Sequence, residues 1–446
     1  DRLLASPAYG VRWGRHWLDL AGYSDSEGKR NADMIRDYAW RYRDYVINAF
    51  NADKPYNEFL IEQIAGDELV DYSNHDAIDA NIIEKLVATG FLRMAPDGTS
   101  ANPVNRVEDR LEVIADELQI LAGGVMGLTM KCARCHDHKY DPISQKEFYQ
   151  LFAMFDGLNE KGFINNLRGS AEPRIRYQET TFNEILKQIE AQEQDKGARE
   201  RKVKELEGKH PHVMIMRNEV ERGAFVLRHG QYDAKGEEVQ PGLPQAFSPT
   251  PQSEKMTRLH LAHWLVDGKH PLTARVLVNR LWEQLFGVGI VKSSENLGVQ
   301  SDWPSHPELL DWLAVDFVES GWDVKGLIRL MVMSKTYRQS AAADAGRLQR
   351  DPENRLLSRG PRMRLQAEMM RDQALFVSGL LVEKLGGPRW WVYQPAGLWL
   401  EVEKRGKFVQ DHGEKLYRRS LYSRIRRTVA PPSMLLFDMP SREMCT

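Results

Sequence analysis

The hydrophobic pattern of the first 160 residues predicts helices. Apolar residues recur every three or four positions over residues 9–20, 38–50, 56–64 and 145–155, a spacing that places them on one face of an α-helix. Pro55 separates the second and third segments, because a proline ends one helix and is tolerated in the first turn of the next. The pattern therefore predicts a helical first domain over residues 1–177.

The pattern changes twice in the middle of the chain. Residues 178–209 are strongly charged with sparse apolar positions, which predicts a solvated helical hairpin with its bend near Gly197. Residues 213–216 and 224–227 then carry β-type residues, followed by glycines and prolines that favour turns. A small β-containing module over residues 210–250 is the prediction, ending in a proline-rich linker at 248–251.

Residues 251–446 predict a second, mainly helical domain. Four segments have helical spacing, namely 272–286, 307–320, 324–334 and 365–381. From 390 to 422 the sequence becomes aromatic and turn-rich, so this C-terminal part is expected to form loops and short strands. The predicted fold class is mainly α, and each helical domain has enough apolar residues for a core of its own.

Composition excludes some classes of protein. The chain has 446 residues, 42% of them hydrophobic, and a net charge of -2, so bulk electrostatics give no case for nucleic acid or an anionic membrane as partner. The sequence contains no run of eighteen apolar residues, and we expect no membrane span in this chain. It opens at Asp1 without a leader, which we interpret as a mature piece or a fragment.

The strongest chemical signal is a C-x-x-C-H motif formed by Cys132, Cys135 and His136. Two thiols at this spacing reach the two vinyl groups of one porphyrin, and the next imidazole falls beneath the iron as its proximal ligand. The motif predicts one covalently attached haem c, and with it a cytochrome-c-like fold for the helical domain over residues 1–177. The third cysteine, Cys445, is expected to be a buried free thiol or to pair beyond the chain's end.

Three alternatives to haem remain open. A thioredoxin-like redox pair needs a strand before the motif, whereas residues 109–130 read as a helix. A zinc site needs four ligands, and Cys132, Cys135, His136 and His138 would have to crowd together to supply them. The third alternative is a pair of buried structural thiols beside a chance histidine.

Residues near the motif are candidates for the rest of the haem site. The sixth iron ligand could come from a soft sulfur or from a distant imidazole, and the candidates are Met126, Met130, Met154 and His16. A polar cluster after the motif could bind propionates, shuttle protons or hold calcium through its two aspartates, or it could be an exposed turn; its members are Asp137, His138, Lys139 and Asp141.

The second domain combines aromatic and cationic residues that could form a substrate cleft. Such residues stack on sugar rings and bind anions, although aromatic residues more often belong to a core. The candidates are Arg275, Arg280, Trp390, Trp391, Arg418 and Arg419.

Long stretches of the chain resemble known domains. The run CARCHDHKYDPISQKEFYQL at 132–151, with residues 6–28 and 39–69, resembles the second planctomycete-specific cytochrome domain. Residues 270–291, 304–340 and 417–446 resemble planctomycete-specific domain one. This resemblance implies an exported protein, periplasmic or at the cell surface, that is often joined to an upstream cytochrome domain and is encoded near sulfatases and polysaccharide-processing enzymes.

We therefore predict an exported c-type cytochrome that carries electrons through one haem to a redox partner or an upstream cytochrome domain. The more specific version of this prediction is a haem-dependent oxidoreductase that acts on glycans. The alternative is a binding or assembly module at the cell surface, in which the second domain docks protein or polysaccharide partners and the haem is absent or vestigial.

Overall fold

A computed structural model describes residues 1–29, 33–74, 77–99, 106–158, 174–218, 220, 222–247, 256–395, 397–398 and 408–440. Helix accounts for 51% of the described residues and strand for 6%, which confirms the mainly α class. The finer prediction of a cytochrome-c-like arrangement stays a prediction. Among the described helices, none is both long enough and apolar enough to cross a bilayer.

The first helical segment begins with α1 (Ala8–Leu20), α2 (Ala39–Ala52) and α3 (Tyr56–Ala65). Asp53 ends α2 in a left-handed conformation, and Pro55 precedes α3. Further helical elements follow along the chain: η1 (Gly66–Leu69), α4 (Ala80–Ala88), η3 (Thr89–Met94), α5 (Arg106–Leu121), the π-turn η4 (Ala122–Met126), the 3-10 turn η5 (Lys131–Arg134) and α6 (Gln145–Ala153).

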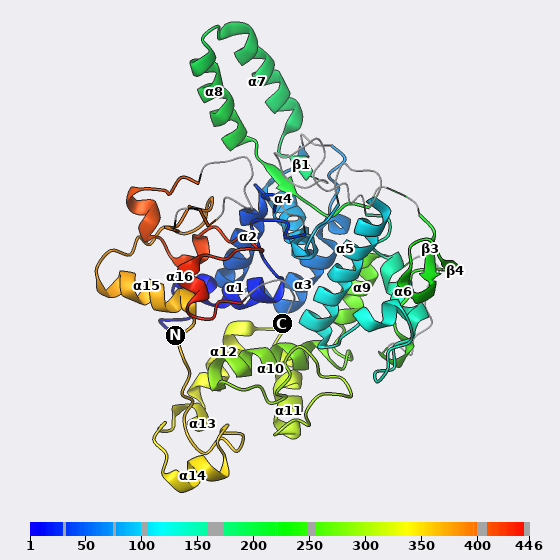
Figure 1. The fold of residues 1–446 in the computed structure, drawn as a ribbon, viewed down its shortest axis with the longest axis vertical. Coiled ribbons are helices and arrows are strands. Elements are labelled where there is room, and N and C mark those ends of the chain that lie inside the picture. Colours follow the sequence, from blue (N-terminus) through cyan, green and yellow to red (C-terminus); the bar gives the residue numbers. More distant parts are fainter. Residues whose placement is uncertain are drawn as a thin grey trace.

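The charged segment forms two helices, α7 (Glu179–Gln192) and α8 (Lys196–Lys209), which project from the body of the molecule (Figure 1). The bend lies before Gly197, because the side chain of Asp195 caps α8 by accepting a hydrogen bond from the Ala198 N–H. At the base of this arm, β1 (Arg174–Arg176) pairs antiparallel with β2 (His212–Met214).

The predicted β-type residues at 224–227 form β3 (Ala224–Leu227), which pairs antiparallel with β4 (Lys235–Val239). This small sheet contacts α6. The short turns η6 (Arg228–Gly230) and η7 (Gln245–Phe247) follow β3 and β4. The predicted linker at 248–251 lies outside the described residues.

The second helical segment contains long helices followed by short elements. They are α9 (Arg258–Leu265), α10 (Thr273–Phe286), α11 (Pro307–Glu319), α12 (Val324–Met333), α13 (Lys335–Arg338), α14 (Ala345–Arg350), α15 (Ala367–Val377), η8 (Gly413–Tyr417), η9 (Ser420–Tyr422) and α16 (Pro432–Leu435). In the C-terminal part, isolated bridges join Val382 to Arg418 and Trp390 to Ser423.

The buried apolar residues of both helical segments form one continuous cluster rather than two separate cores. Helix α9 packs on α3, and α10 packs on η4. A buried ion pair reinforces the first contact: Arg258, with no exposed surface, donates to both oxygens of Asp67 at 2.9 and 2.6 Å. The separate cores predicted from the sequence are thus merged, because the helices of one segment use those of the other as packing partners.

Candidate functional site

The C-x-x-C-H motif lies on the surface, after α5 and η4. The thiols of Cys132 and Cys135 are both exposed and form no disulfide. Ala133 between them is fully buried and anchors the turn, with its N–H donating to the Met130 carbonyl at 2.9 Å. The Cys135 N–H donates to the Cys132 carbonyl at 3.3 Å. The two thiols therefore project from a single 3-10 turn fixed at its centre.

Helix α6 holds the middle of the motif in place. The Arg134 carbonyl accepts hydrogen bonds from the Tyr149 hydroxyl at 2.9 Å and from the Gln145 amide at 3.0 Å. Burial raises the pKa of Tyr149 to about 12, so its hydroxyl remains a donor at neutral pH. The Gln145 N–H donates to Asp137 at 2.8 Å. These contacts fix the C-terminal end of the turn, and the residues that follow it, to one helix.

An ion-pair cluster lies on the α5 side of the motif. Glu112 pairs with Lys131 at 2.9 Å and with Arg134, and Asp116 pairs with Lys131 at 2.6 Å. Burial alone would raise the pKa of Glu112, but hydrogen bonds from Lys131 and Arg134 lower it to about 2. The cationic residues of the motif are therefore largely neutralised by acidic residues of α5.

The ring of His136 is exposed and has a defined tautomer. Its Nδ1 lies 2.7 Å from the Asp137 carbonyl oxygen, and a carbonyl only accepts, so Nδ1 must carry the hydrogen. The lone pair is then on Nε2, the usual arrangement for a histidine that ligates a metal. A covalent haem needs two free thiols for its vinyl groups and one imidazole nitrogen for its iron. The residues present therefore fit that cofactor.

The candidate sixth ligands do not share this surface. Met126, Met130 and Met154 are 1%, 1% and 3% exposed and belong to the core cluster. His16 is on α1 and lines a cavity that none of residues 132–136 lines. Burial and the neighbouring Arg12 and Arg15 hold its pKa well below the usual value.

Two side chains of the polar cluster after the motif accept hydrogen bonds from backbone N–H groups. His138 is buried at its side chain, and its Nδ1 accepts from the Asp141 N–H at 2.9 Å. Asp141 in turn accepts from the Val299 N–H at 2.7 Å, which ties the motif loop to the second helical segment. Lys139 lies over the ring of Tyr140, 5.0 Å from its centroid.

These positions give the predicted calcium site no support. Asp137 accepts a hydrogen bond from the N–H of Gln145, the first residue of α6, and Asp141 accepts one from a backbone N–H of another segment. Over the described ranges, there is no group of three or more histidine, cysteine, aspartate or glutamate residues that could hold a metal ion. Calcium at Asp137 and Asp141 stays a prediction.

The predicted cleft residues of the second segment are spread over several contacts. Arg275 pairs with Asp311 at 2.7 Å near the surface, whereas Arg280 donates to the Gly123 carbonyl at 2.9 Å and lines the same cavity as His16. Arg419 binds both oxygens of Glu383 and lines a different cavity.

The remaining three candidates help to build the C-terminal part. Trp390 is 2% exposed, with the Arg371 guanidinium 5.0 Å from its ring centroid. Arg424 lies 3.5 Å from the ring centroid of Trp391. Arg418 donates to the carbonyls of residues 384, 386 and 388. The six residues thus do not converge on one cavity.

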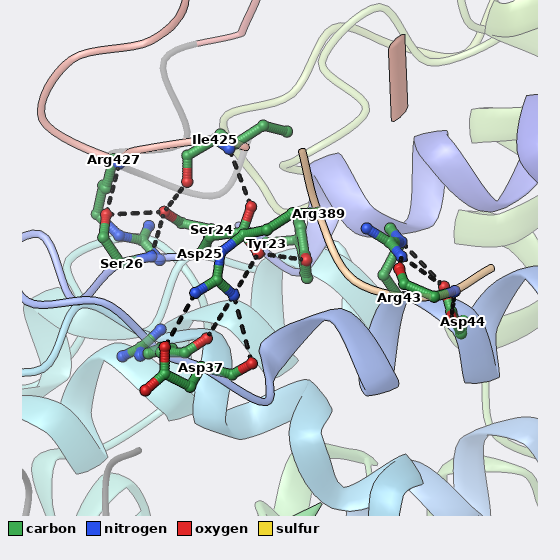
Figure 2. A network of polar contacts seen from close by, with 12 residues as sticks. Tyr23, Ser24, Asp25, Ser26, Asp37, Arg43, Asp44, Arg389, Ile425 and Arg427 are labelled. Carbon is green, nitrogen blue, oxygen red and sulfur yellow. Dashed lines mark hydrogen bonds and ion pairs between the residues drawn. The ribbon is translucent and has the colours of Figure 1, made fainter. Parts of the chain in front are cut away.

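Sequence reasoning missed a buried polar network between the start and the end of the chain (Figure 2). Asp25 has no exposed surface; it accepts from the Tyr23 hydroxyl at 2.8 Å and from the Ile425 N–H at 2.9 Å. Arg389 lies 3.7 Å from Asp25 and 3.2 Å from Asp37. This network joins residues 400 positions apart.

Two segments of the chain match known protein families. Residues 1–160 match PSCyt2, a protein of unknown function (DUF1549), and residues 257–446 match PSD1, a protein of unknown function (DUF1553). Their order is that expected from the resemblance, which is confirmed. No curated protein and no solved structure matches the chain.

Proposed function

On the premise that the chain belongs to the proteins in which PSCyt2 precedes PSD1, we propose that it is an exported c-type cytochrome. Cys132 and Cys135 would hold one haem through thioethers, and the Nε2 atom of His136 would bind its iron. The bound haem would supply a one-electron redox centre. The observation that carries the proposal is that both thiols are free of a disulfide and lie beside an imidazole whose other nitrogen is already engaged.

The surrounding residues would keep this site rigid and accessible. The Tyr149 and Gln145 hydrogen bonds hold the Arg134 carbonyl, and therefore the spacing of the thiols, in place. The exposed position suits exchange of electrons with a partner protein or an upstream cytochrome domain. Covalent haem attachment to this motif takes place outside the cytoplasm, which is the basis for proposing a periplasmic or cell-surface protein. An oxidoreductase acting on glycans is the sharper form of the same proposal.

The four candidate sixth ligands do not share the exposed surface of the motif. Met126, Met130 and Met154 lie in the core, and His16 lines a separate cavity. If none of them would hold a bound haem, the reduced protein should bind carbon monoxide. An absorption spectrum that carbon monoxide leaves unchanged would instead favour one of these residues as a ligand.

The attachment itself is tested on protein exported from cells that contain a c-type haem maturation system. Denaturing gels stained for haem should show a band, and the mass should exceed that of the polypeptide by one haem. Cys132→Ser should reduce the amount of covalently bound haem, and His136→Ala should change the absorption spectrum of the haem. His263 is an exposed histidine on α9, and His263→Ala should change neither property. A colourless protein whose two thiols both react with an alkylating reagent would refute the proposal.

One observation favours the second candidate function, a binding or assembly module. Cofactor sites are usually concave and bury most of their ligand, whereas Cys132, Cys135 and His136 are all exposed. Under this alternative the second segment docks protein or polysaccharide partners and haem is absent or vestigial. The same gel and mass measurement separates the two candidates.

A further inference from the structure

A cavity of about 370 Å³ lies between α1 and α10, and therefore between the segments that match PSCyt2 and PSD1. Its size falls in the range of small-molecule sites. Helix α1 contributes Trp13 and His16, α10 contributes Arg280, Glu283 and Gln284, and Gln366 precedes α15. None of residues 132–136 lines it.

The charged groups around this cavity are largely balanced. Arg15 pairs with Asp19 at 3.2 Å and with Glu368 at 2.9 Å. Asp438 at the edge pairs with Arg364 at 2.5 Å, and Glu295 is exposed. The cavity therefore lacks a strong field of one sign that would select an anion or a cation.

His16 offers a hydrogen-bond donor inside the cavity. Its Nε2 lies 2.8 Å from Nη1 of Arg12, and because a guanidinium only donates, Nε2 accepts and Nδ1 carries the hydrogen. Within the part of the chain that the structure describes, no partner is found for Nδ1. Burial and two neighbouring arginines keep the pKa of His16 low, so the ring is neutral.

Helix α10 contributes complementary groups. Glu283 accepts from the Ser294 hydroxyl at 2.8 Å through Oε2, and its Oε1 has no partner among the described residues. Burial raises the pKa of Glu283, against hydrogen bonding by Ser294 and the charge of Arg280, which lower it. Gln284 accepts only a long 3.4 Å contact from Gln366 through Oε1, which leaves its amide hydrogens for a ligand.

We propose that this cavity binds a neutral, hydroxyl-rich ligand, namely a sugar ring. Each hydroxyl both donates and accepts, so it can bond to the His16 donor and the Glu283 acceptor together. The partly exposed indole of Trp13 provides an apolar face for ring C–H groups. This site is separate from the proposed haem site and does not depend on it.

The test uses the full chain and a set of methyl glycosides of glucose, galactose, mannose, xylose, fucose and N-acetylglucosamine. Saturation-transfer NMR identifies a binder, and titration calorimetry gives its Kd. His16→Ala and Glu283→Ala should each raise Kd by about tenfold, because each removes one hydrogen bond to the ligand from a partly buried site. Gln284→Ala provides a third variant in case one of these fails to fold.

Trp312→Ala serves as the matched control, since Trp312 is an exposed tryptophan of α11 that does not line the cavity; it should change Kd by less than about twofold. Sodium sulfate and sodium acetate are the charged comparators. The proposal is overturned if no methyl glycoside binds saturably, if the cavity variants bind as tightly as the unaltered chain, or if either anion binds more tightly than every glycoside.

Discussion

Replacing Asp25 by alanine tests whether the network of Figure 2 holds the two ends of the chain together. The carboxylate accepts hydrogen bonds from the Tyr23 hydroxyl and the Ile425 N–H, and all three groups lie in the interior. Alanine removes the acceptor of both hydrogen bonds. A buried donor that loses its partner destabilises a protein by about 1–3 kcal/mol, so two predict a loss of about 2–6 kcal/mol.

Equilibrium unfolding in urea, followed by tryptophan fluorescence, measures the loss. Asp37→Ala is a matched control, because Asp37 pairs with the same Arg389 at 3.2 Å but its side chain is 51% exposed. An exposed ion pair contributes about 0–1 kcal/mol. If Asp25→Ala lowers the free energy of unfolding by less than about 1 kcal/mol, or by no more than Asp37→Ala does, the reasoning is wrong.

Two further predictions concern the motif and acid stability. Gly230 has φ +71°, and an added Cβ would lie 2.8 Å from the Cys135 sulfur, so Gly230→Ala should destabilise the chain by about 1–2 kcal/mol and reduce haem attachment. Gly413 is also left-handed, at φ +65°, but has open space around its Cβ, so Gly413→Ala should destabilise the chain without reducing haem attachment. Equal haem attachment in the two variants would contradict the steric argument. Burial lowers the pKa of His270 from 6.5 to about 4, so folding favours its neutral form. This preference should contribute roughly 3 kcal/mol to the free energy of unfolding above pH 6.5, and the contribution should be lost as the pH falls toward 4. His270→Asn should flatten the stability curve in that range, whereas a curve as steep as that of the unaltered chain would rule out this origin.

Local pattern was enough to predict most helices, because the spacing of apolar residues reports which face is buried. It was also enough to identify the motif, since Cys132, Cys135 and His136 are adjacent in sequence. The hairpin at 178–209 was predicted in the same way, and its bend lies just before Gly197, where the side chain of Asp195 caps α8.

Long-range pairing could not be predicted from one sequence. Nothing in the residues around Tyr23 indicates that Asp25 will meet the backbone of Ile425, although a buried carboxylate needs partners somewhere. For the same reason, Trp390 looked like a cleft residue but lies in the core. The cavity between α1 and α10 depends on two helices more than 250 residues apart, and only Arg280 and His16 had been singled out, for other roles.

The projecting arm of α7 and α8 has a consequence for how chains of this kind can differ in length. Its two ends meet where β1 pairs with β2, in the register Ile175 to Val213, so the segment leaves and re-enters the body at a single place. Residues 178–209 also lie outside both matched families. We therefore expect that the arm can be lengthened, shortened or exchanged without changing the path of the other elements, and that this junction is a suitable point for grafting a foreign domain onto the protein.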